Sequence, residues 1–136
     1  FDTIESEFVK VLYQHGFDVQ FSHIWTGSDF FEIQSTDIAG VDCIVSNPPF
    51  SKRQAVFEKL YELGKPFAMI INFNGLFDAK SRWKLFNEHP FELLIPEGRI
   101  KFSDSNGLKN SPNFQSIYVC KDILEYQIVF SKMSSK

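Results

Sequence analysis

The sequence contains few cysteines, no excess of basic residues and no long apolar run. Its two cysteines, Cys43 and Cys120, both lie in apolar stretches, which favours buried free thiols in a reducing cytoplasm over a disulfide. The 14 Lys and Arg residues are outnumbered by 17 Asp and Glu residues, so the net charge does not favour nucleic-acid binding. No apolar run could span a membrane, and no signal peptide is present. We therefore expect a cytoplasmic protein without membrane contact.

Several common catalytic motifs are also absent. His15, His23 and His89 lack the spacing to the two cysteines that zinc sites have, so we expect no metal. The sequence has no Gly-Lys-Ser/Thr phosphate loop and no nucleophile elbow. Zinc enzymes, P-loop proteins and α/β-hydrolases are therefore not indicated.

Phenylalanine, in contrast, is abundant, with 16 of the 136 residues. Such a composition predicts a folded globular chain, and the length fits one domain spanning residues 1–136 with a single core. The polar stretch 103–113 contains Gly, Asn and Pro, so we expect a mobile loop there.

Helical and strand-like segments alternate along the chain. Capping-box patterns at residues 2–5 and 51–54 predict helices that end at Gly16 and Gly64, and Asn74 is the expected cap of a third helix that ends before Pro90. We expect strands at residues 17–22, 41–46, 67–73, 91–95, 99–102, 115–120 and 126–130. This order predicts an α/β fold with a mostly parallel sheet and an antiparallel C-terminal edge.

The stretch from Asp42 to Phe50 is the most informative part of the sequence. An apolar run predicts a short buried strand, and Pro48 and Pro49 must end it because proline cannot donate to a strand ladder. Pro48 also favours an extended backbone at Asn47. The result is a stiff loop at the C-terminal end of a strand, the edge where open α/β sheets bind ligands.

The loop has the groups needed to bind a planar amine. The Asn47 side-chain oxygen and the Pro48 carbonyl are two acceptors for an NH2 group, and Phe50 offers a flat face for a ring. Accepting both amino hydrogens returns electron density to the nitrogen, which makes it more nucleophilic. The loop is therefore suited to an sp2 amine such as the exocyclic amine of adenine. An ordinary Pro-Pro surface loop is the alternative.

A strand followed by Asn47-Pro48-Pro49-Phe50 resembles the signature of amino-methyltransferases that use S-adenosylmethionine (SAM). That family acts on DNA and RNA adenine, on rRNA guanine and on glutamine amides, and Phe at the fourth position is common in its nucleic-acid enzymes. The resemblance implies a Rossmann-like methyltransferase sheet, SAM as the cofactor and adenine in DNA as the substrate. It also implies that Asn47, Pro48, Pro49 and Phe50 are the catalytic residues.

The same resemblance implies residues that contact SAM. Asp29 and Phe30 match an Asp-Phe pair that binds the cofactor's adenine, although an Asp that begins a turn explains them equally well. The family has a Gly-rich turn before its first helix, where this sequence has Asp2 and Ser6, as cofactor contacts or as helix caps. His23 stands where the family has an acidic residue that holds both ribose hydroxyls; a neutral His accepts only one hydrogen bond.

Two arginines are the expected contacts to DNA. Arg53 follows the Asn47–Phe50 loop and Arg99 precedes the polar stretch 103–113, so both are candidates for binding phosphates around a flipped base. Solvated surface charges are the alternative.

The resemblance covers nearly the whole chain but leaves one strand without a counterpart. Residues 17–22 match the second family strand, 41–46 the fourth, 67–73 the fifth, and 91–102 with 115–120 the closing strands. No segment matches the first, central strand, so we expect residues upstream of Phe1 in the parent protein or a partner that fills the gap. Two other functions stay open: a non-catalytic binding module with a degenerate methyltransferase fold, and an amino-methyltransferase acting on RNA or a protein glutamine.

Overall fold

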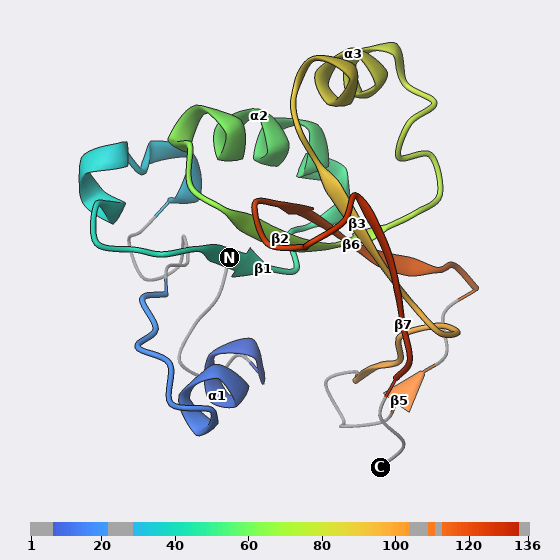
Figure 1. Cartoon of the computed structure of the whole chain (residues 1–136), viewed down its shortest axis with the longest axis horizontal. Helices are drawn as coiled ribbons and strands as arrows, with labels where there is room; N and C mark the ends of the chain where they lie inside the picture. Colours follow the sequence, from blue (N-terminus) through green and yellow to red (C-terminus); the bar gives the residue numbers. More distant parts are fainter. Residues whose placement is uncertain (1–6, 22–28, 104–108, 111–112, 134–136) are drawn as a thin grey trace.

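The structure is a computed structural model, and it describes residues 7–21, 29–103, 109–110 and 113–133. A five-stranded sheet with the order β1-β2-β6-β3-β7 forms its centre (Figure 1). The strands are β1 (Ile44–Ser46), β2 (Phe67–Asn72), β3 (Glu92–Pro96), β6 (Ser116–Lys121) and β7 (Ile128–Ser131). The β1–β2 and β3–β7 pairs are parallel, whereas β6 is antiparallel to both neighbours. Only β6 therefore runs against the others, and the prediction of an α/β fold with a mostly parallel sheet is confirmed.

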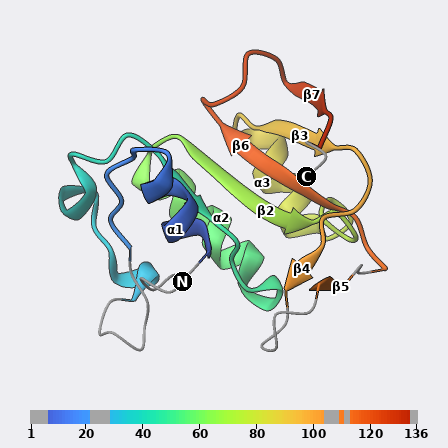
Figure 2. The same ribbon diagram turned by 90° about the horizontal axis from the view of Figure 1, so that it is seen from below.

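The antiparallel strand does not lie where we predicted it. It is inside the sheet, between β2 and β3, and the C-terminal edge strand β7 is parallel to β3 (Figure 2). Ile117, Val119 and Cys120 of β6 are buried, as expected for a strand inside a sheet, whereas Phe130 of the edge strand β7 is 78% exposed. The sequences of the two strands, both rich in apolar residues, do not explain which of them lies inside.

In the part of the chain that the structure describes, three α-helices lie around the sheet. They are α1 (Glu7–Gln14), α2 (Arg53–Leu63) and α3 (Lys80–Glu88), with the 3-10 turns η2 (Phe30–Glu32), η3 (Ser35–Ile38) and η4 (Phe50–Lys52). Helices α2 and α3 lie on one side of the sheet, and α1 lies on the other side at the β1 end (Figure 1). The core between α2, α3 and the sheet is rich in aromatic rings, with Phe57 and Phe86 at 5.2 Å between centroids.

The predicted helix ends are confirmed, but two predicted starts are wrong. Gly16 and Gly64 follow α1 and α2 with φ of 84° and 76°, a conformation that glycine adopts without strain. Helix α2 begins at Arg53 because the tighter turn η4 precedes it, and no side chain caps it. Helix α3 begins at Lys80 rather than after Asn74. The first capping box, at residues 2–5, lies outside the described residues.

Two predicted strands also differ from the structure. Residues 17–21 form no strand, and β1 is an edge strand that pairs, among the described residues, with β2 alone. The strand predicted at 99–102 is reduced to β4 (Phe102–Ser103), which pairs with β5 (Lys109–Asn110) inside the stretch 103–113. Residues 104–108 and 111–112 of that stretch lie outside the described residues. The mobile loop therefore stays a prediction.

The two cysteines are free, but they differ in exposure. Cys120 is buried in β6 as predicted, whereas Cys43 is exposed, contrary to prediction, because the chain enters β1 only at Ile44. Burial raises the pKa of the Cys120 thiol to about 12. Within the described ranges, no helix combines the length and apolar character that a membrane span requires.

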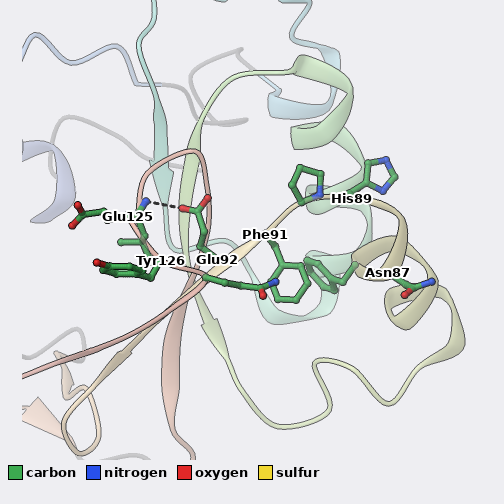
Figure 3. A pocket seen from close by; sticks show the side chains of 10 residues that line it. Asn87, His89, Phe91, Glu92, Glu125 and Tyr126 are labelled. Carbon is green, nitrogen blue, oxygen red and sulfur yellow. Dashed lines mark hydrogen bonds between the residues drawn. The ribbon is translucent and has the colours of Figure 1, made fainter.

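The Glu92 side chain of β3 binds the turn between β6 and β7. Its carboxylate accepts backbone N–H bonds from Asp122 (2.8 Å), Ile123 (3.0 Å) and Leu124 (2.6 Å) in the turn between β6 and β7. The turn borders an open hollow of about 570 Å³, to which Glu92, His89 and Tyr126 contribute (Figure 3). Glu92 is the first residue of β3, so this hollow lies at the amino end of that strand.

We predict that Glu92→Ala lowers the free energy of unfolding by about 1–3 kcal/mol, because three backbone donors lose a charged acceptor. Urea denaturation monitored by circular dichroism measures the change. Glu97→Ala is the matched control, because the Glu97 side chain is exposed, and we expect a change within about 0.5 kcal/mol. Equal stability of the two variants would contradict this role for Glu92.

Candidate functional site

The loop Asn47–Phe50 follows the C-terminal end of β1 and contains both buried and exposed residues. Ser46 and Pro48 are buried, whereas Asn47, Pro49 and Phe50 are exposed. Pro49 is extended, with φ −61° and ψ 136°, and its carbonyl accepts a bond from Lys52 N (3.1 Å) as η4 begins. The buried proline and the short helical turn hold the backbone, while the Asn47 and Phe50 side chains reach solvent.

Phe50 lies against the guanidinium of Arg53. The ring is 55% exposed, and the guanidinium carbon lies 4.2 Å from its centroid. A cation at this distance from a ring is attracted to the π-face. Arg53 therefore braces Phe50 and leaves much of the ring accessible to a ligand.

The same guanidinium binds the loop that follows β2. Arg53 Nη1 donates to Asn74 O (3.0 Å) and Asn72 O (3.4 Å), and Nη2 donates to Gly75 O (3.0 Å). Arg82 donates to the same Gly75 carbonyl (2.7 Å). Because β1 and β2 are parallel neighbours, the loops after them meet at one edge of the sheet. Arg53 connects these two loops.

The contact of Arg53 with phosphates stays a prediction, and the structure shows what the guanidinium binds within the chain. Its side chain is buried, with 7% exposure, and it faces backbone carbonyls. Burial lowers the pKa of Arg53, the charge of Arg82 lowers it further, and Asp78 raises it. Sequence alone shows a basic residue after the loop but not that the first turn of α2 directs it inward. Arg99 lies exposed between β3 and β4.

The predicted cofactor residues inside the described ranges make contacts within the chain. Asp29 Oδ1 accepts from Phe31 N (2.9 Å) and caps η2. Phe30 is buried in the hydrophobic core, with its ring 5.5 Å from that of Phe31. These contacts fit the alternative of an Asp that begins a turn, and the role of the pair as a cofactor contact stays a prediction. Asp2, Ser6 and His23 lie outside the described residues.

The turn that contains Asp29 nevertheless lies beside the Asn47–Phe50 loop. Lys52 Nζ of η4 lies 5.6 Å from the centroid of the Phe31 ring in η2. The structure therefore gathers three segments near the same edge: the loop after β1, the loop after β2 and η2.

Comparisons with known proteins give little further information. No protein-family model and no curated protein matches the chain. The crystal structure of M1.HpyAVI is similar over 80% of this chain and 67% of its own, with 14% identity and a TM-score of 0.34. Its SAM complex is similar over 79% of this chain and 64% of its own, less than two thirds of its length, with 17% identity and the same TM-score of 0.34. Similarity at this level does not establish a common function.

The close contact between Arg53 and the loop after β2 favours a glycine at position 75. It has φ +68°, and a Cβ added there would lie 3.2 Å from Arg53 Nη2. Gly98 has φ +73° with nothing within 4 Å of an added Cβ, so it shares the backbone conformation without the contact.

We predict that Gly75→Ala is more destabilising than Gly98→Ala. Each variant loses about 1–2 kcal/mol because an L-residue is strained at positive φ, and only Gly75→Ala also displaces the buried guanidinium. Parallel urea unfolding curves measure the difference. Identical losses would show that Arg53 moves aside freely and does not fix the two loops.

Proposed function

We propose that this chain is a SAM-dependent methyltransferase domain that acts on the exocyclic amino group of adenine in DNA. The observation that supports it is the Asn47–Phe50 loop. It is stiffened by two prolines, lies at the carboxyl end of a parallel strand and presents Asn47 and Phe50 to solvent. The buried guanidinium of Arg53 lies against the Phe50 ring. This contact supports a ring that is positioned for stacking rather than an aromatic side chain that moves freely on the surface.

In this proposal the loop binds and activates the amine. A flipped adenine stacks on Phe50, and the Asn47 side-chain oxygen and the Pro48 carbonyl accept its two amino hydrogens. These bonds hold the nitrogen in one orientation and increase its nucleophilicity, so catalysis comes from positioning and polarisation. Pro49 keeps the backbone extended between the acceptors and the ring.

The donor in this proposal is SAM, and it rests on the resemblance alone. Its proposed contacts are Asp2, Ser6, His23, Asp29 and Phe30. Arg99 is the proposed contact to DNA phosphate. We also place the protein in the cytoplasm, without membrane contact.

A non-catalytic binding module is the second candidate. The structural roles of Asp29 and Phe30 favour it, because the described residues keep the base-binding loop but use this pair for capping and packing. The acidic balance, with a net charge of −3, gives weight to a protein glutamine as an alternative substrate. An RNA base is the other alternative.

We predict that Asn47→Ala reduces methyl transfer by at least about 100-fold, the scale of losing one oriented polar group in an active site. Transfer of labelled methyl from SAM to adenine-containing DNA measures this. Circular dichroism verifies the fold. Asn87→Ala is the control, because Asn87 is an exposed amide on α3, away from the loop.

Full activity of Asn47→Ala would contradict the proposed mechanism. Absence of transfer by the unaltered protein, together with measurable binding of deoxyadenosine monophosphate, would instead support the non-catalytic module.

A further inference from the structure

The loop after β2 repeats the pattern of the loop after β1. Asn72 ends β2 and Phe73 follows it, as Asn47 follows β1 shortly before Phe50. Phe73 is 44% exposed, so both loops present a partly exposed ring. Since β1 and β2 are parallel neighbours, the loops that follow them, which carry the two rings, lie at the same end of the sheet.

The backbone that carries Phe73 is firmly anchored. Phe73 N donates to Gln115 O (2.9 Å), and the Phe73 carbonyl accepts from Leu76 N (3.2 Å). Asn72 Oδ1 accepts from Asn74 N (2.8 Å). An exposed ring on a backbone held at this many points loses little conformational freedom when it binds a ligand.

Arg53 links the Phe50 ring to the backbone that carries Phe73. Its guanidinium lies against Phe50 and donates to the carbonyls of Asn72 and Asn74, the residues on either side of Phe73. One buried charged group therefore sets the position of the Phe50 ring and of the Phe73 backbone.

We propose that Phe73 is a second stacking platform, which binds the nucleobase next to the one that stacks on Phe50. This inference rests on the proposed function for the class of ligand. Neighbouring strands are about 4.8 Å apart, so the loops that follow β1 and β2 lie close enough together to contact one nucleic-acid strand. The exposed amide of Asn74 supplies donors and acceptors for the edge of that base. Stacking of this kind is tolerant of base identity.

Binding measurements with two ligands of different length test the proposal. Calorimetric titration compares deoxyadenosine monophosphate, which offers one base, with a single-stranded trinucleotide that has adenine in the centre. The proteins are the unaltered chain, Phe50→Ala, Phe73→Ala and the control Trp83→Ala, whose ring is 60% exposed on α3. Circular dichroism verifies that each variant is folded.

We expect Phe73→Ala to weaken trinucleotide binding by about fivefold to 150-fold, the range for one lost stacked base, and to leave mononucleotide binding within about twofold. Phe50→Ala should weaken both ligands, and Trp83→Ala neither. Unchanged trinucleotide affinity of Phe73→Ala would overturn the inference. Equal weakening of both ligands by Phe73→Ala would also overturn it, because the two rings would then serve one base.

The two proposals fail in distinguishable ways. If Phe50→Ala has no effect while Phe73→Ala weakens the trinucleotide, the proposed function loses its base platform and the Phe73 platform stands. If the unaltered protein binds neither ligand, both proposals are wrong.

Discussion

The guanidinium of Arg53 is the interaction on which the candidate site depends. A buried cation costs several kcal/mol unless its donors are bonded, and here three carbonyls and the face of Phe50 surround it. Satisfying this one group requires the loop after β1 and the loop after β2 to meet in a defined arrangement. Arg82 reinforces it from α3 through the shared Gly75 carbonyl. The arrangement of the two loops in the candidate site therefore follows from the burial of the Arg53 charge between them.

The aromatic core explains why Arg53 stays in place. Helix α2, which begins at Arg53, buries Phe57 against Phe67 of β2 and Phe86 of α3. These rings prefer tilted and edge-to-face contacts, which orient the helix as well as bury it. The helix in turn aims its first turn at the carbonyls after β2. Packing in the core and geometry at the edge are thus connected through a single helix.

Local patterns predicted the parts of the structure that depend on local physics. Two prolines end β1 whatever surrounds them, and Gly16 and Gly64 stop their helices because of their backbone freedom. The inward direction of Arg53 and the interior place of β6 could not be predicted, because they depend on neighbours distant in sequence. Cys43 was wrongly expected to be buried, since an apolar run does not show where its strand begins. The roles of Asn47, Phe50, Asp2, Ser6, His23 and Arg99 stay predictions.

The most direct test of the central claim is an NMR titration of the isotope-labelled protein with deoxyadenosine monophosphate. If the loop after β1 holds an adenine amine, Phe50 ring protons show NOEs to adenine ring protons, and the Asn47 side-chain amide shifts in a saturable way. The same experiment reports the rest of the surface, including the hollow beside Glu92 and Tyr126. Saturable shifts confined to that hollow, with Phe50 and Asn47 unchanged, would contradict the account.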